Sequence, residues 1–312
     1  MADTLLSFWK TYRRQSDNYD ITLIHYYSVK CKSVFLILHT FAGELEPKKD
    51  MKENILIEDF DFTLIADFFK RIDRQGPGGD NETMLAKYLL PNFEKDIRIA
   101  DIGCGTGRQT AVLAEMFDGQ IDAVDLFPEM LDGLMARCIQ RGVADKVNPI
   151  KASMDALPFL PETYDLIWAE GSIFIIGYEK GLRYWRQFLK PSGFIVVSEC
   201  SWLGDKRPQN MSWIHDNLPE IDTIDNKIRQ MQKAGYEPYA HFTLPEHCWT
   251  DNYYAHMPKA MDAFLTDHPS HPSAQIFVER MKEEIAYYQN NKDTFGYVFY
   301  IGRKARQGDC RI

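Results

Sequence analysis

The residue types best suited to binding chemistry gather at residues 99–110, where an apolar run ends in Asp101 and then breaks into alternating glycines. Gly103, Gly105 and Gly107 can adopt positive φ angles and let a ligand lie against bare backbone. A helix that begins directly after such a turn presents unpaired N–H groups to that ligand. The pattern therefore predicts a buried strand, a tight ligand-binding loop and the start of a helix.

The spacing of the glycines narrows the class of ligand. A dinucleotide-binding loop would place its third glycine or alanine three residues after the second, and Arg108 occupies that position. No Gly-Lys-Ser/Thr sequence follows the glycines, so a phosphate-binding P-loop is not indicated either. Asp101 would repel a pyrophosphate but suits an ammonium or sulfonium group. We therefore expect a cationic ligand that contains adenosine.

Two further acids follow later strands. Asp125 ends the second predicted strand, where a carboxylate can accept both hydroxyls of a ribose. Asp155 follows the third predicted strand, where it can accept from an adenine amine. Met154 and either Phe127 or Leu126 could hold the faces of the adenine ring. A single acid at a strand end is usually a solvated loop residue, but together these residues indicate a nucleoside site.

The elements that must position these residues alternate between strand and helix after residue 96. Strands are expected over 98–102, 120–126, 147–152, 164–170 and 194–199, with helices over 107–117, 128–141 and 178–189. Such alternation implies right-handed crossovers and a parallel sheet. The C-terminal part is expected to contain helices over 224–234, 259–265 and 274–290, and strands over 236–244 and 295–303.

The N-terminal part has a different texture. Residues 1–50 mix aromatic and basic residues without a clear period, and we expect them to be either a poorly ordered extension or a stretch upstream of the natural start at Met51. Helical spacing of apolar residues predicts an amphipathic helix over 57–71. The Gly- and Pro-rich residues 74–80 form either a plain connector or a flap over the ligand site, and a helix over 80–90 follows.

Composition limits the class of protein. The 312 residues are 45% hydrophobic, which is ample for a sizeable core, and their formal net charge of −9 argues against nucleic acid as the main partner. The six cysteines include no CxxC pair, so no disulfide framework and no metal site is expected. The longest apolar run, 34–38, is far shorter than the ~20 residues that span a bilayer. We expect a cytoplasmic protein without a membrane partner.

Five successive motifs resemble those of class I S-adenosylmethionine-dependent methyltransferases. They are DIGCGTG at 101–107, VD at 124–125, MDALPF at 154–159, YDLI at 164–167 and LKPSGF at 189–194. Within that family the chain is similar to the small-molecule branch that includes ubiquinone/menaquinone-biosynthesis methyltransferases. It resembles still more a group of uncharacterised Bacteroides-type methyltransferases, which share RQGPG at 74–78, SECSW at 198–202 and WTD at 249–251.

The resemblance implies an α/β fold with a Rossmann-like, seven-stranded, mostly parallel sheet, helices on both faces and a helical cover. Its last strand, expected at 295–303, would run antiparallel beside the fifth. The implied domain layout is a methyltransferase domain over 51–305, a cofactor-binding core over about 95–200, cover elements over 57–90 and 245–292, and a tail over 306–312.

The implied cofactor is S-adenosylmethionine. By position, Gly103, Cys104 and Gly105 would lie along its methionine and ribose, and Glu170 and Gly171 near its methionine end. Cys104 is expected to be a small packing residue of the turn. The full expected cofactor-binding set is Gln75, Asp101, Gly103, Cys104, Gly105, Asp125, Leu126, Phe127, Met154, Asp155, Glu170 and Gly171.

Methyl transfer from a sulfonium to a small organic acceptor is an in-line displacement on an activated donor, so alignment and desolvation provide much of the rate. A base is optional. The candidate bases are Glu170, Glu199, His241 and His247, for each of which a structural role is the more common one. The residues expected to face the acceptor are Trp202, His247, Trp249 and Tyr253.

Two other functions stay open at this point. A binding or regulatory protein could retain the cofactor pocket without turnover, because no compelling base is evident. A nicotinamide-dependent oxidoreductase is disfavoured by Arg108 at the third-glycine position. The acceptor and its methylated atom do not follow from the residues, and assembly as a homodimer is left open.

Overall fold

The computed structural model describes residues 63–93 and 95–306. The expected extension over 1–50, the proposed start at Met51, the beginning of the helix expected at 57–71 and residues 307–312 of the tail lie outside the described residues. No helix among the described residues is long and apolar enough to cross a bilayer.

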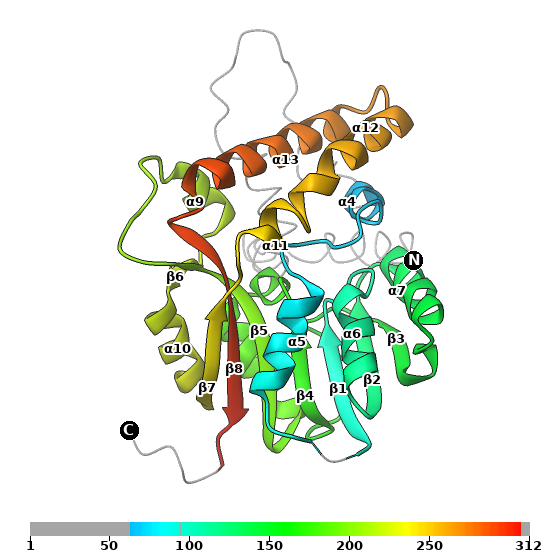
Figure 1. The fold of residues 1–312 in the computed structure, drawn as a ribbon, viewed down its shortest axis with the longest axis vertical. Coiled ribbons are helices and arrows are strands. Elements are labelled where there is room, and N and C mark those ends of the chain that lie inside the picture. The colour runs from blue at the N-terminus through cyan, green and yellow to red at the C-terminus, as the bar shows by residue number, and fades with distance from the viewer. Residues whose placement is uncertain (1–62, 94, 307–312) are drawn as a thin grey trace, which may run out of the picture.

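One sheet of eight strands forms the centre of the described chain. The strands are β1 (Ile97–Ile102), β2 (Gly119–Asp125), β3 (Val147–Lys151), β4 (Tyr164–Ala169), β5 (Leu189–Trp202), β6 (Asp222–Thr223), β7 (Tyr236–Thr243) and β8 (Phe295–Lys304). Their order is β3-β2-β1-β4-β5-β8-β7, with the short β6 paired to β5. Neighbouring strands from β1 to β5 pair in parallel, whereas β8 runs antiparallel to both β5 and β7. The expected mostly parallel sheet with an antiparallel last strand is confirmed (Figure 1).

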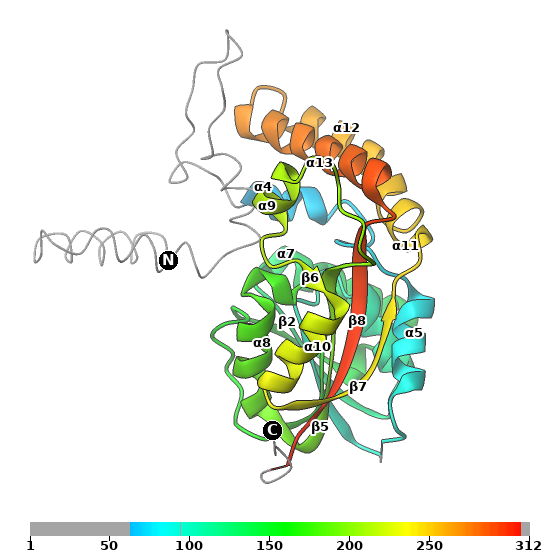
Figure 2. The same ribbon diagram turned by 90° about the vertical axis from the view of Figure 1, so that its left-hand side faces the viewer.

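Helices cover both faces of the sheet. One face packs against α5 (Asp80–Leu89), α6 (Arg108–Met116) and α7 (Pro128–Arg141), and the other against α8 (Tyr178–Trp185) and α10 (Ile224–Lys233). Figure 2 shows α8 and α10 on the opposite side of the sheet from α5. Short 3-10 helices connect several elements: η2 (Ala144–Lys146), η3 (Ile173–Ile175) and η4 (Arg186–Phe188).

The alternation of side chains along β4 shows why both faces need cover. Leu166 and Trp168 point into the core that contains α5, α6 and α7, whereas Ile167 and Ala169 point into the core around α8 and α10. Successive side chains of a strand point to opposite faces, so a continuous apolar run requires a helix layer on each side.

A set of helices, called the cap below, lies over the carboxyl ends of the parallel strands (Figure 1). It consists of α4 (Thr63–Phe69), α9 (Ser212–Asn217), α11 (His247–Thr250), η5 (Tyr254–His256), α12 (Met257–Asp267) and α13 (Pro272–Asn291). Phe68 joins three of these helices, because its ring meets Phe264 of α12 and Phe277 of α13 edge-on at 5.4 and 5.0 Å between centroids. The cap thus brings together segments from both ends of the described chain.

One expected boundary is wrong. The helix expected over 178–189 forms as α8 followed by η4, but the strand expected from 194 already begins at Leu189, which pairs with Tyr164. Proline at 191 cannot continue a helix and favours an extended residue before it, so the chain turns through η4 and enters the sheet early. The short elements α9, β6 and α11 were not predicted, because each is too brief to carry a periodic pattern.

Candidate active site

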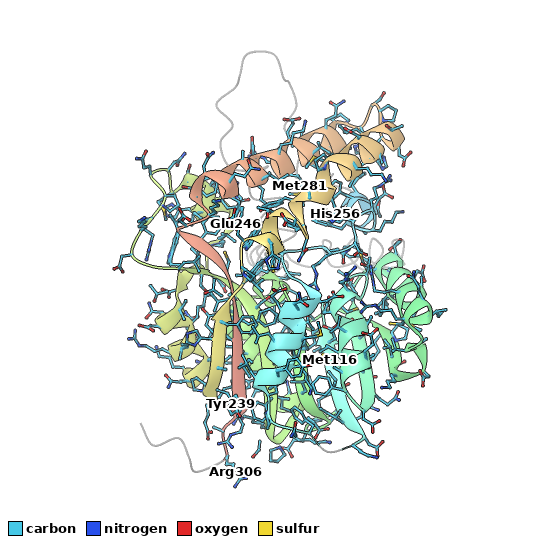
Figure 3. All side chains as sticks on the ribbon, viewed as in Figure 1. Met116, Tyr239, Glu246, His256, Met281 and Arg306 are labelled. Carbon is cyan, nitrogen blue, oxygen red and sulfur yellow. The ribbon has the colours of Figure 1, made fainter. Side chains whose placement is uncertain are left out.

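A cavity of about 360 Å³ lies between the carboxyl ends of the parallel strands and the cap. The sheet side contributes the loop after β1, the end of β2 and the turn after β4, and the cap side contributes residues of α11, η5 and α13. Met281, which lines the cavity, lies in the cap in Figure 3, whereas Tyr239 and Arg306 lie at the opposite end of the molecule. The cavity occupies the edge at which open α/β sheets bind ligands.

The glycine loop forms one wall of the cavity. Gly103, Gly105 and Gly107 have φ angles of 77°, 53° and 75°, the left-handed region that other residues disfavour. The N–H groups of Gly103 and Cys104 donate to the carbonyl oxygen of Val124 at 2.8 and 2.9 Å, which ties the loop to β2. A ligand can therefore approach the backbone here without meeting a side chain.

Gln75 covers the same loop from the segment that follows α4. Its Oε1 accepts from the N–H of Thr106 at 2.9 Å, and its Nε2 donates to the carbonyl of Ile72 at 2.9 Å. Gln75 lines the cavity together with Gly103, Cys104 and Gly105, and all four were expected in the cofactor-binding set. Arg108 is directed away to Asp80, with Nε donating to Oδ1 at 2.8 Å.

Asp125 lines the cavity at the end of β2. Its Oδ2 accepts from the N–H of Gly105 and its Oδ1 from the N–H of Phe127, each at 3.0 Å. Burial raises the pKa of this carboxyl group, while backbone donors at Phe127, Gly105 and Leu126 act in the opposite sense. Each carboxylate oxygen can accept a second hydrogen bond, which is what recognition of a diol requires.

Asp101 does not line the cavity. Its carboxyl group accepts from Thr110 Oγ1 at 2.5 Å and from Gln109 Nε2 at 3.3 Å, both on α6. Asp101 shares with Ile99 the face of β1 that α6 covers, and strand residues two apart point the same way. Burial raises its pKa to about 7. The expected direct contact of Asp101 with a ligand cation is therefore replaced by a contact that holds α6 to β1.

Glu170 lies in the cavity wall, but its oxygens are occupied. Oε2 accepts from Arg74 Nη1 at 2.9 Å, and Oε1 accepts from Thr83 Oγ1 at 2.7 Å and Trp168 Nε1 at 2.9 Å. The side chains of Arg74 and Glu170 are only 8% and 4% exposed. This buried ion pair links the 74–80 loop to the end of β4, and it leaves Glu170 poorly placed to act as a base.

The residues expected at adenine separate into two groups. Leu126, Phe127 and Met154 line the cavity, so their apolar surfaces are available to a ring. Asp155 does not line it, and its Oδ1 accepts from Ser153 Oγ at 2.6 Å.

Three of the four candidate bases lie outside the cavity. Glu199 is buried on the far face of β5 with Lys227 Nζ at 3.5 Å, and burial raises its pKa to about 7. His241 is exposed on β7, the edge strand of the sheet. His247 is exposed on α11, with Nε2 3.3 Å from Glu82 Oε1.

The four residues expected to face the acceptor also divide. Trp249 and Tyr253 line the cavity, whereas Trp202 and His247 do not. Trp202 is packed under Arg207, whose guanidinium lies 4.4 Å from the indole centroid. Among the described residues, the one grouping with metal-ligand spacing is Glu82, His247 and Cys248, which also lies outside the cavity wall.

Three charged residues of the cavity wall were missed, Arg74, Arg280 and Glu284. Arg74 belongs to a quoted motif but gave no chemical signal on its own. Glu284 did have a signal: Phe277, Met281, Glu284 and Tyr288 recur at helical spacing, so one acid interrupts the apolar stripe of α13.

Residues 99–193 match the family described as a methyltransferase domain. An uncharacterised protein of Haemophilus influenzae is 26% identical over 137 residues, which cover 42% of this chain and 53% of that protein. The ubiquinone/menaquinone biosynthesis C-methyltransferase of Pectobacterium atrosepticum is 31% identical over 107 residues, covering 33% of this chain and 43% of that protein. The chain thus spans about half or less of the length of these curated relatives.

Solved structures share the fold over more of the chain. A methyltransferase from Geobacter sulfurreducens, solved with S-adenosyl-L-homocysteine, aligns with a TM-score of 0.67 at 16% identity over 77% of this chain and 97% of its own. A methyltransferase from Thiobacillus denitrificans, solved with the same compound, aligns with a TM-score of 0.65 at 20% identity over 78% and 98%. The nearer likeness to Bacteroides-type proteins stays a prediction. Residues 99–193 therefore match a methyltransferase domain, and the chain has the fold of these solved methyltransferases.

Proposed function

We propose that this protein transfers a methyl group from S-adenosylmethionine to a small organic acceptor. The observation that supports the proposal most is the meeting of the glycine loop, the Asp125 carboxylate and the turn at Gly171 in one cavity beneath the cap. The solved methyltransferases of this fold contain S-adenosyl-L-homocysteine, the demethylated product of that cofactor.

The described residues fit this cofactor at both ends. Asp125 would accept the ribose hydroxyls, and the Leu126, Phe127 and Met154 side chains would enclose adenine. At the methionine end, Arg74 Nη2 is buried without a hydrogen-bond partner among the described residues, 3.7 Å from Asp80 Oδ1. Because Arg74 lines the cavity, this nitrogen would donate to the methionine carboxylate.

When bound, S-adenosylmethionine supplies an activated methyl group, since the acceptor lone pair forms the new bond while the carbon–sulfur pair leaves on sulfur and the acceptor sheds a proton. The protein aligns the two molecules and excludes water, which suffices for much of the rate. Glu170 holds Arg74 through its ion pair and is a positioning residue in this scheme. A dedicated base is not required by the arrangement.

Calorimetry with S-adenosylmethionine and S-adenosylhomocysteine tests the cofactor assignment. We expect Asp125→Ala to weaken binding by roughly a hundredfold, because it removes charged hydrogen bonds worth about 1.5–3 kcal/mol each. Asp132→Ala, at an exposed position of α7, is the matched control and should bind as the wild type does. No binding by the wild type, or undiminished binding by Asp125→Ala, would contradict the proposal.

A cofactor-binding protein without turnover is the second candidate, favoured by one observation: both oxygens of Glu170, the candidate base in the cavity wall, already accept hydrogen bonds. Methyl-labelled cofactor and pools of small acceptors distinguish the two, since label transfer excludes the second. We further propose a cytoplasmic protein whose acceptor is not nucleic acid, in view of the net charge of −9. Assembly as a homodimer stays a prediction for light scattering to test.

A further inference from the structure

The cap side of the cavity contains a carboxylate that the protein leaves largely unpaired. Glu284 of α13 lines the cavity, and its one described hydrogen bond is donated by the hydroxyl of Tyr254 to Oε1 at 3.1 Å. Oε2 receives no hydrogen bond from any described residue. Glu284 is partly exposed, and it is a cavity-lining side chain.

No described cation balances the charge of Glu284. Arg280 lies one turn earlier on α13 and also lines the cavity, but its described ion pair is with Glu283, where Nη1 donates to Oε2 at 2.8 Å. Burial raises the pKa of Glu284 to about 7, opposed only by the Tyr254 hydrogen bond. A partly buried carboxylate without a cation carries a desolvation cost, so this cavity wall suits a cation from outside.

Aromatic rings surround this carboxylate. Trp249 stacks between Tyr288 and Tyr297, with centroid distances of 4.3 and 5.2 Å, and Tyr254 meets Tyr288 edge-on at 5.5 Å. Tyr253 lies against Tyr254 at 5.1 Å, and all five rings line the cavity. An open ring face attracts the alkyl groups of an organic cation, while the carboxylate neutralises its charge; the faces of Trp249 are taken by its two stacked neighbours, so the tyrosines would make this contact.

The aromatic wall extends to the place where methyl transfer would occur. The hydroxyl of Tyr297 lies 3.8 Å from the position that a Cβ on Gly171 would take. Tyr297 therefore connects the cap with the turn after β4, where the methionine end of the cofactor is expected. A molecule held at Glu284 would lie beside the transferred methyl group.

We infer that the acceptor carries a cationic nitrogen, as an ammonium or quaternary ammonium group, which Glu284 pairs and the tyrosine rings surround. The inference rests on the proposed methyltransferase function and names its substrate class. A neutral acceptor would leave Glu284 without a counter-charge, and an acidic acceptor would be repelled by it. Glu284 is a substrate-binding residue in this assignment, and it need not contact the methylated atom.

Two matched pairs of small probes test the inference on the full chain saturated with S-adenosylhomocysteine. The pairs are choline with 3,3-dimethylbutan-1-ol and 3-methylbutan-1-amine with 3-methylbutan-1-ol, and binding is followed by ligand-observed NMR at pH 8. Each pair has nearly one shape and differs in charge. We expect at least one cationic member to bind about tenfold or more tightly than its neutral partner, as a desolvated cation–π and ion-pair contact would give.

Glu284→Gln should abolish that preference, because it removes the charge at nearly constant volume. Glu279→Gln is the matched control, since Glu279 lies on the same helix with its side chain 66% exposed. Equal binding of the two members of both pairs by the wild type, or a preference that survives in Glu284→Gln, would overturn the inference.

The same series separates this inference from the proposed function. S-adenosylhomocysteine binding is measured first in the wild type and in each variant. If the wild type does not bind S-adenosylhomocysteine, the proposed function itself is contradicted. If the cofactor product binds and methyl label moves only to neutral acceptors, the function stands and the cationic acceptor is wrong. Label found in amines, and lost in Glu284→Gln while cofactor binding persists, supports both.

Discussion

The two sides of the cavity treat their carboxylates in opposite ways. On the sheet side, Asp125 is held by two backbone N–H groups and Glu170 by an arginine, a threonine and a tryptophan. On the cap side, Glu284 has a single tyrosine hydroxyl. The sheet side is built in advance for a fixed ligand, because backbone geometry and paired charges hold its groups in place. The cap side leaves one charge for the acceptor to satisfy.

The largest expected effect comes from breaking the buried pair on the sheet side. Arg74→Met should lower the free energy of unfolding by about 3–5 kcal/mol, because Glu170 would remain buried without its cation. Chemical denaturation measures this, with Arg183→Met as the control for an exposed pair with Glu179, expected to change stability by less than about 1 kcal/mol. If the double variant Arg74→Met, Glu170→Gln recovers no stability, the unpaired charge is not the cause.

The glycine loop gives the next effect. Gly103→Ala should reduce cofactor-product binding by more than tenfold and cost roughly 2 kcal/mol of stability, since it combines a left-handed φ with a Cβ 2.5 Å from that of Ser172. Gly142→Ala isolates the backbone cost, because Gly142 has a φ of 71° and nothing within 4 Å of an added Cβ. In thermal melts, Gly103→Ala should lose more stability than Gly142→Ala, and the difference measures the steric clash with Ser172. Equal losses of stability in the two variants would show that the loop can accommodate the added Cβ.

On the cap side, removing a charge should stabilise the protein rather than destabilise it. The pKa of Glu284 is raised from 4.5 to about 7, so the unfolded chain ionises first and the free energy of unfolding falls as pH rises through that window. Glu284→Gln should therefore stabilise the protein at pH 8 by on the order of 2 kcal/mol and leave it nearly unchanged at pH 4. The variant must be compared with the wild type at each pH, because Asp101 and Glu199 titrate in the same range. A loss of stability at pH 8 would show that Glu284 is paired after all.

The smallest effect is the pH dependence of probe binding. Choline keeps its charge at every pH, so its affinity should rise by up to about tenfold between pH 6 and 8 as Glu284 ionises, and should stay flat in Glu284→Gln. The titratable groups around Glu284 do not interfere, because burial raises the pKa values of Tyr253, Tyr254, Tyr297 and Cys200 well above their usual range. A titration followed by NMR checks the slope, and a flat wild-type curve would contradict the role of Glu284.

Local patterns account for what the sequence could predict. The glycine turn, the strand that ends at Asp125 and the helix over 128–141 each have a signal within about a dozen residues, and the structure places them accordingly. The antiparallel place of β8 came from the family resemblance, since pairing between distant strands leaves no local pattern.

The rest depends on contacts between distant segments. The pairing of Arg74 with Glu170 joins residues 96 positions apart, and no property of either residue alone predicts it. The direction of Asp101 toward α6 likewise depends on which face of β1 the helix covers. Glu284 could have been noticed as the acid in an apolar stripe, but its lack of a cation is visible only once the neighbouring helices are in place.

The antiparallel pairing of β7 with β8 has one more consequence. The two strands pair from Tyr236 opposite Lys304 to Thr243 opposite Val298. Residues 244–294, which lie between them in the sequence, therefore form one long hairpin connection. α11, α12 and α13, with Glu284 and most of the aromatic wall, belong to that connection. The proposed acceptor-binding part thus enters and leaves the sheet on one strand pair. On the proposed function, exchanging this connection would change the acceptor while the pairing of β1 to β5 stays as it is.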